Sequence, residues 1–175
     1  MSFSSLPDPD AGSSSAPASR GFILGPDDGD PYHWLGTLSL TKVRGTSTAG
    51  NLDIVDHRVP PGYAPPKHVH HQSDEVFFLL DGHLEVTCGD ETWQANPGSL
   101  VFLPRRVPHG FTNSSDGPAR TLLINAPAGF GELIVALGDP APKLDMPAQD
   151  APMPPPDQVT SESEKYGIGQ VPDRS

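Results

Sequence analysis

Short apolar or alternating runs, each bounded by Gly, Pro, Asn or Asp, fill the chain from about residue 20 to residue 138. Alternation of apolar and polar residues over a few positions is the pattern of a half-buried β-strand. The runs are HWLGTLSLTKV, NLDIVDHRV, EVFFLLDG, HLEVTCG, ETWQANPG, SLVFLP and RTLLINAP. Their number and spacing predict an all-β domain built as a sandwich or a barrel.

Two tight turns and one helix are also predicted within this region. The pairs Asp81–Gly82 and Gly89–Asp90 separate consecutive strand-like runs, and Gly permits the positive φ that short hairpin turns require. The run FGELIVALG at 130–138 favours a helix that ends at Gly138.

The two ends of the chain differ in composition from the middle. Residues 1–19 are rich in Ser, Pro, Ala and Asp, so we expect a disordered tail. The remainder, 139–175, begins with a Pro-rich run that should lie as an extended strap on the surface. A short helix is expected after it, with Asp157 as its N-cap and Gly167 directly after its end. The predicted organisation is therefore a tail, a β-barrel over 20–138, and a strap with a terminal helix.

Length and charge narrow the classes of partner. The chain has 175 residues, 22 Pro and 18 Gly, which fits one domain of short strands. Its formal net charge is −11, and no basic cluster exceeds the pair Arg105–Arg106, so nucleic acid and anionic membranes are poor partners. No apolar run approaches the roughly 20 residues of a membrane span, and no secretory signal pattern is present. We therefore expect a cytoplasmic protein, in which the single cysteine, Cys88, is a buried thiol.

Three of the seven histidines directly precede the strand-like run EVFFLLDG. His68 and His70 are two residues apart, so on a strand their imidazoles project from the same face. His71 falls on the opposite face by the same rule. The first two histidines can therefore reach one point in space, whereas the third is expected on the outside.

Glu75 follows the polar break HQSD after these histidines. If a strand restarts near this point, Glu75 shares its inner face with Phe77 and Leu79. A carboxylate among buried apolar neighbours costs several kcal/mol unless a cation compensates it. His109, at the start of a segment that also contains Phe111, is a fourth candidate. Imidazoles with one carboxylate suit Fe, Ni, Co, Cu, Mn or Zn, and suit Ca or Mg poorly.

The spacing of these residues resembles the two sequence motifs of the cupin family. The residues that match the first motif are Gly62, His68, His70, Glu75 and Gly82. Those that match the second are Gly98, Pro104, His109 and Asn113. Arg106 stands where such families place a Gly, and positive φ at this residue would cost on the order of 1–2 kcal/mol.

The resemblance implies a small antiparallel, jelly-roll-like β-barrel with a short helix after it. It also implies one divalent transition metal inside the barrel, bound by His68, His70, Glu75 and His109. The pocket beside the metal would have apolar walls, with Phe77, Leu79 and Phe111 among them, and would accept a small organic substrate. The histidines outside the motifs, His33, His57 and His83, are expected to be structural or exposed to solvent. The aromatic residues Trp34, Trp93, Phe102 and Phe111 are expected to fill the core, and Asn113 to serve the turn after its strand.

Among single-domain cupins, the chain is similar to bacterial quercetin 2,3-dioxygenase-like proteins. The similarity lies in the HxH-to-Glu spacing, the stretch NAPAGFGELIVALG, and the Pro-rich strap before KYGI. It implies oxygen-dependent cleavage of a flavonol-like phenol, with Glu75 as both metal ligand and base. Two alternatives stay open: a metal-assisted cyclase, isomerase or lyase acting on a polyketide or keto acid, and a non-catalytic small-molecule-binding cupin. A homodimer is expected because symmetric dimers are the commonest soluble assemblies.

Overall fold

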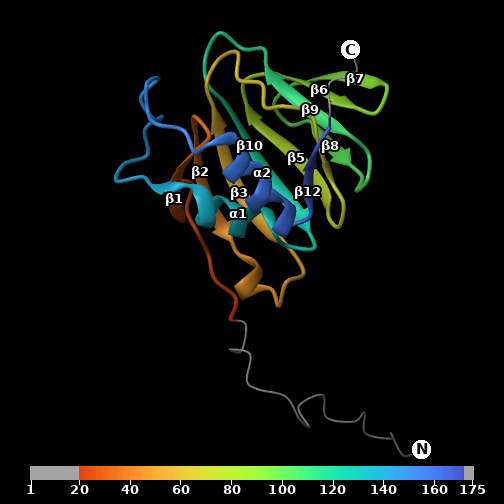
Figure 1. Ribbon diagram of the computed structural model, residues 1–175. Helices are drawn as coiled ribbons and strands as arrows, with labels where there is room; N and C mark the ends of the chain where they lie inside the picture. Colours follow the sequence, from red (N-terminus) through yellow and green to blue (C-terminus); the bar gives the residue numbers. More distant parts are fainter. Residues whose placement is uncertain (1–19, 172–175) are drawn as a thin grey trace, which may run out of the picture.

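Two antiparallel β-sheets and two short α-helices make up most of the fold in the computed structural model, which describes residues 20–171 (Figure 1). The larger sheet has seven strands in the order β11-β1-β2-β3-β10-β5-β8, and the smaller has five in the order β12-β4-β9-β6-β7. This arrangement confirms the predicted all-β, jelly-roll-like fold class. The predicted disordered tail, 1–19, lies outside the described residues.

The strand and helix bounds follow the predicted runs closely. The strands of the larger sheet are β1 (Asp30–Trp34), β2 (Thr37–Val43), β3 (Asp53–Val59), β5 (Asp74–Asp81), β8 (Leu100–Leu103), β10 (Ala119–Ala126) and β11 (Asp139–Pro140). Those of the smaller sheet are β4 (His68–His70), β6 (Leu84–Cys88), β7 (Glu91–Ala95), β9 (His109–Asn113) and β12 (Ile168–Gln170). The helices are the short 3₁₀ helix η1 (Gly45–Ser47), α1 (Phe130–Leu137) and α2 (Pro156–Lys165).

The core lies between the two sheets and is filled by alternate residues of each strand. Phe77 and Leu79 of β5 pack there against Leu84, Val86 and other side chains of the smaller sheet. Trp34 and Phe111 are buried in this core, and Cys88 is a buried free thiol, as predicted.

The prediction that Trp93 and Phe102 fill the core is wrong, because these side chains are 42% and 54% exposed. Both belong to strands at the edge of a sheet, β7 and β8. In β8 the neighbouring residues Val101 and Leu103 pack inward, so Phe102 must face outward.

The predicted turns and the start of α1 have clear physical causes. Gly82 and Gly89 both adopt positive φ, as short turns require. Gly89 joins the paired strands β6 and β7, as predicted. The predicted hairpin at Gly82 is wrong, because this turn joins β5 to β6, which lie in different sheets. Helix α1 ends at Gly138, as predicted. The buried carboxylate of Asp53 accepts hydrogen bonds from the first backbone N–H groups of this helix, at Gly129 (2.7 Å) and Gly131 (3.0 Å). This fixes α1 against β3, where it can close one end of the space between the sheets.

The segment after α1 contributes more than the predicted strap and helix. β11 extends the larger sheet by pairing with β1, and β12 extends the smaller one by pairing with β4. Helix α2 begins after Pro155, which makes no side-chain cap, so the prediction of Asp157 as the N-cap is wrong. Asp157 lies instead in the first turn, where its charge suits the helix dipole. The helix ends at Tyr166, before Gly167 with its positive φ, as predicted.

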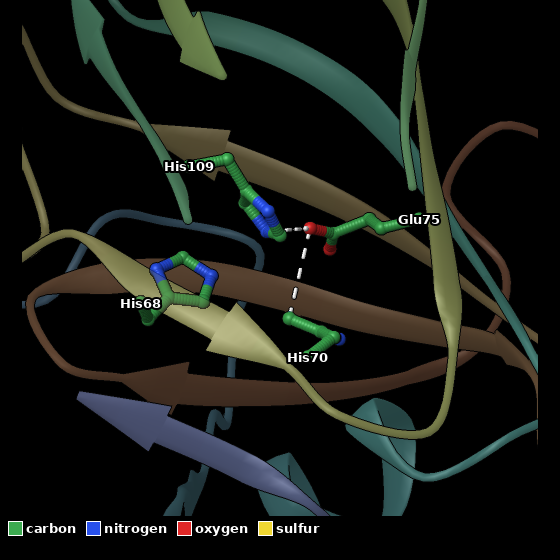
Figure 2. Close-up of side chains that lie close together, drawn as sticks. All are labelled: His68, His70, Glu75 and His109. Atoms are coloured by element: carbon green, nitrogen blue, oxygen red, sulfur yellow. Dashed lines mark ion pairs between the residues drawn. The ribbon is translucent and has the colours of Figure 1, made fainter. Parts of the chain in front are cut away.

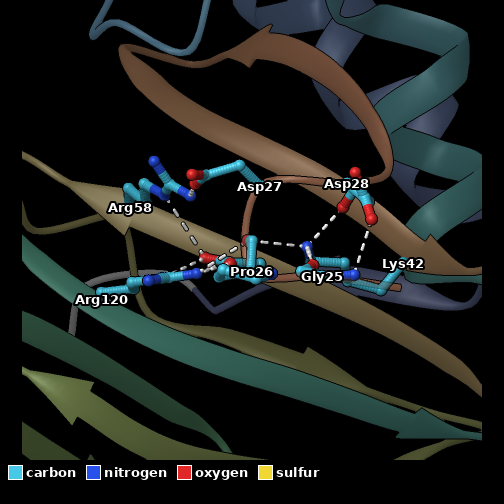
Figure 3. Close-up of polar contacts among 8 residues, drawn as sticks. Gly25, Pro26, Asp27, Asp28, Lys42, Arg58 and Arg120 are labelled. Carbon is cyan, nitrogen blue, oxygen red and sulfur yellow. Dashed lines mark hydrogen bonds and ion pairs between the residues drawn. The ribbon is translucent and has the colours of Figure 1, made fainter. Parts of the chain in front are cut away.

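Polar contacts fasten the segment before β1 to the outer face of the larger sheet (Figure 3). The buried carboxylate of Asp56 pairs with Arg120, and Arg58 pairs with Asp27 at 2.9 Å. The Lys42 amine donates to backbone oxygens of this segment, among them Pro26 at 2.9 Å. These bonds hold the outer side of β2 and β3 without entering the space between the sheets. No helix within 20–171 has the length and apolar character needed to cross a membrane.

Candidate metal site and interior cavity

The structure brings together the four side chains predicted as ligands. His68 and His70 come from β4, Glu75 from the start of β5, and His109 from the start of β9. One ligand atom from each lies within 4.8 Å of the others. Figure 2 shows the imidazoles of His70 and His109 turned toward the Glu75 carboxylate, with His68 beside them. His71 is exposed and outside this cluster.

Hydrogen bonds orient all three imidazoles in the same way. Nδ1 of His68 lies 3.1 Å from the Pro66 carbonyl oxygen, and Nδ1 of His109 lies 2.9 Å from that of Val107. A carbonyl oxygen only accepts, so each Nδ1 must carry the proton and donate it. His70 makes the corresponding bond to the Ser73 hydroxyl at 3.1 Å. The Ser73 hydroxyl can donate or accept, so the carbonyl partners fix the tautomer only at His68 and His109. When neutral, these two rings present an unprotonated Nε2 to the cluster, as metal-ligating histidines do when their other nitrogen is engaged.

Unpaired buried atoms show that the cluster suits a cation. Nε2 of His70, Nε2 of His109 and Oε2 of Glu75 are buried without a hydrogen-bond partner. The Nε2 atoms of His70 and His109 lie 3.7 and 3.2 Å from Glu75 Oε2. Buried polar atoms are rarely left unpaired, because each costs about 1–3 kcal/mol. Two imidazole nitrogens and a carboxylate oxygen gathered at one point are a donor set that a divalent transition metal would satisfy.

The protonation states agree with this donor set. Burial alone would raise the pKa of Glu75, but the surrounding imidazoles outweigh it and lower that pKa to about 2. Burial lowers the pKa of His68 to about 4 and also lowers that of His70. At His109 burial acts in the same direction, yet the adjacent Glu75 carboxylate reverses it and raises the pKa. Near neutral pH the cluster thus offers an ionised carboxylate and at least two neutral imidazoles.

The turn before His109 contains the one departure from the cupin motifs. Arg106 has φ of 67°, so an Arg adopts the left-handed conformation that the usual Gly would provide. Its backbone N–H donates to the His70 carbonyl oxygen at 2.7 Å. The turn is thereby tied to the strand that bears His70, and His109 keeps its place despite the substitution.

Replacing Arg106 by Gly should therefore stabilise the protein slightly. The substitution removes about 1–2 kcal/mol of left-handed strain, offset by roughly 0.5–1 kcal/mol of extra chain entropy in the unfolded state. We expect the melting temperature to rise by a few degrees at most, measured by circular dichroism, with unchanged metal content. A clear fall in melting temperature would contradict the strained-turn interpretation.

Asn113 links the ends of the two motifs, and this exceeds the turn role predicted for it. Its side-chain amide donates to the carbonyl oxygens of Val59, Pro60 and Gly117 at 2.9–3.1 Å. Its backbone oxygen accepts from Gly62 N–H at 3.0 Å. The loop between β3 and β4 is thereby fixed, and with it Tyr63 at the edge of an interior cavity.

This cavity, of about 110 Å³, lies beside the cluster and has mainly apolar walls. His68 and Glu75 form part of its wall, whereas His70 and His109 lie behind it. Phe77 and Phe111 line the cavity, but Leu79 does not. Leu79 sits further along β5, where it bonds to the Gly98 turn, and is buried in the core instead.

Two groups of residues around the cavity were not anticipated as site residues. Helix α2 and strand β12 cover it with Val159, Ser163 and Ile168–Gln170. His57, expected to be structural or exposed, is only 3% exposed and lines the cavity, while His83 is exposed and His33 half-buried. The sequence did contain a signal for His57, because it shares strand parity with the apolar residues Val55 and Val59.

The two packed sheets and the buried His/Glu cluster define the class of this protein as a β-sandwich with a candidate metal site. Comparisons with known proteins agree with this class. Residues 55–125 match the family model of the cupin domain. The chain belongs to the cupin superfamily.

The individual relatives are named for different activities. The chain is 29% identical over 104 residues to quercetin 2,3-dioxygenase of Bacillus subtilis, covering 59% of this chain and 30% of that protein. It is 30% identical over 88 residues to polyketide synthase CurC of Streptomyces cyaneus, covering 50% of this chain and 56% of that protein. The structure of the polyketide cyclase RemF from Streptomyces resistomycificus matches with a TM-score of 0.53 and 21% identity, over 61% of this chain and 80% of that one. The chain spans about half or less of the length of these two curated relatives.

Proposed function

We propose that this protein is a metal-dependent cupin enzyme that cleaves a flavonol-like phenol with dioxygen. The observation that supports this proposal is the position of the cluster in the wall of an apolar cavity, through His68 and Glu75. A structural metal site is closed by protein ligands, whereas a catalytic site keeps a position open to its substrate. The similarity to the Bacillus dioxygenase supports the choice of reaction.

Each part of the site would have a distinct role. A divalent Fe, Ni, Co, Mn, Cu or Zn ion would act as a Lewis acid and make the substrate hydroxyl more acidic. Glu75, ionised because its pKa is about 2, would accept that proton. So weak a base can do this only if the hydroxyl has itself been acidified. Phe77 and Phe111 would pack against the flat ring and exclude water.

The size of the cavity places a condition on this proposal. Pockets for drug-sized ligands measure roughly 300–1,000 Å³, whereas this cavity measures about 110 Å³. A single-ring phenol would fit with little change. A flavonol would require movement of the cover formed by α2 and β12.

A second candidate function is a cyclase or isomerase that acts on an enolisable polyketide or keto acid without dioxygen. The 30% identity with CurC supports it. Glu75 would then move a proton to or from a carbon beside a carbonyl group. This reaction would use the same ligands and the same apolar walls.

We expect the metal-loaded protein to consume one dioxygen and release one carbon monoxide for each quercetin cleaved. An oxygen electrode and mass spectrometry of the product would measure this, with chelator-treated protein as the control. Both atoms of dioxygen should enter the organic product, as labelling with ¹⁸O₂ would show. Intact quercetin after incubation with fully metal-loaded protein would rule out the dioxygenase proposal. Turnover of an enolisable polyketide without oxygen uptake would favour the second candidate.

A further inference from the structure

His57 is a buried polar group of the cavity that neither the candidate metal site nor the proposed proton transfer uses. It lies on the inner face of β3 and is only 3% exposed. Its ring contacts Tyr63 and Phe111 edge-on, with centroids 6.4 and 6.3 Å away. All three rings line the cavity, whose walls are otherwise mostly apolar.

A chain of two hydrogen bonds determines which nitrogen of His57 bears the proton. The Thr37 hydroxyl donates to the Trp34 carbonyl oxygen at 2.5 Å, which uses its only proton. Nε2 of His57 lies 2.9 Å from the same hydroxyl oxygen. Since that oxygen can now only accept, Nε2 must carry the proton and donate it. The neutral ring therefore has an unprotonated Nδ1.

This Nδ1 is buried and has no hydrogen-bond partner. Burial lowers the pKa of His57 to about 4, so the ring stays neutral near pH 7 and Nδ1 remains an acceptor. His57 lines the cavity, whereas its hydrogen-bond partner Thr37 does not. An unpaired buried acceptor is costly, and a ligand that supplied a donor to it would remove this cost.

We propose that His57 is a specificity-determining residue that accepts a hydrogen bond at Nδ1 from a hydroxyl or amino group of the substrate. This inference rests on the proposed function only in placing a small organic ligand at the metal cluster. The donor would belong to the body of the ligand, away from the group held at the cluster. The substrate class is thereby narrowed to phenols or enols that chelate a metal and carry at least one further hydrogen-bond donor.

The test compares two probes that share a chelating group. Quercetin carries several hydroxyls besides the chelating one, whereas 3-hydroxyflavone carries none. In the metal-loaded wild type we expect quercetin to bind more tightly, by calorimetry or fluorescence. The variant His57→Phe, which keeps an aromatic ring, should weaken quercetin binding about tenfold and change 3-hydroxyflavone binding less than twofold. Equal weakening of both probes, or of neither, would overturn the proposal.

A second variant keeps the test decisive if His57→Phe does not fold. Thr37→Val preserves shape but removes the hydrogen bond that fixes the His57 tautomer. It should weaken quercetin binding severalfold and leave 3-hydroxyflavone binding and metal content unchanged. Unchanged quercetin affinity in a folded Thr37→Val protein would count against the proposal. Because binding is measured anaerobically, without turnover, failure of the dioxygenase proposal would be seen separately in the oxygen-uptake experiment.

Discussion

Replacing Glu75 by Gln is expected to remove most of the bound metal from the protein. The substitution keeps the shape of the side chain but replaces an anionic donor by a neutral amide among three imidazoles. Changes to outer-shell partners alone commonly cost 10–100-fold in metal affinity. Loss of an anionic ligand should therefore cost at least about 100-fold. Elemental analysis after gel filtration would measure the metal bound per chain.

Asp74→Asn provides the matched control for this experiment. It removes the same charge one residue away, from a side chain that points outward and pairs with Arg105 at 2.8 Å. We expect it to retain the wild-type metal content, even if its melting temperature falls slightly. Wild-type metal content in Glu75→Gln would show that the cluster is not the metal site. An equal loss in both variants would show that net charge, rather than ligation, controls binding.

Gly82→Ala is expected to be among the most destabilising single-methyl substitutions in this chain. Gly82 has φ of 78°, and a Cβ there would lie 2.7 Å from Cβ and 2.8 Å from Cα of Ala119. Left-handed strain contributes about 1–2 kcal/mol and overpacking a further 1–3 kcal/mol. The melting temperature should fall on the order of 10 °C, measured by calorimetry or circular dichroism.

Gly98→Ala separates these two contributions. Gly98 has φ of 88°, but a Cβ there would have no neighbour within 4 Å. This variant carries the strain without the overlap, so its melting temperature should fall by only about 5 °C. Equal losses in the two variants would mean that Ala119 moves aside freely. The difference between them measures how tightly the turn between β5 and β6 packs on β10.

Three of the four candidate ligands were predictable because their spacing is local, and the fourth, His109, was predictable from the second motif. His68 and His70 share a face by strand parity, and Glu75 shares one with Phe77, so short-range geometry and the two motifs brought them together. The outward orientation of Phe102 was not predictable, because SLVFLP is apolar on both faces and gives no parity. Strand β12 is too short to produce a periodic signal, and only its pairing with β4 in the folded chain defines it.

The prediction for His57 shows a different limit. The alternation in NLDIVDHRV predicts that His57 faces inward. The tautomer of His57, however, depends on its contact with Thr37, which is twenty residues away in the sequence. That contact arises because His57 lies opposite Ser39 and Thr37 is near it across the β2–β3 pair. Tertiary pairing, rather than any motif, thus determines which nitrogen of His57 is left without a hydrogen-bond partner.

Strand β12 both covers the cavity and pairs with β4, and these two roles restrict how a ligand can enter the cavity. It pairs with all three residues of β4, whereas β9 is in register with β4 only at His68 and His109. An entry route that displaced β12 would therefore unpair the strand that bears His68 and His70, and would loosen these two candidate metal ligands. Helix α2 forms part of the same cover through Val159 and Ser163 but pairs with no strand. Outward movement of α2 alone would admit a larger ligand while both histidines stay in place.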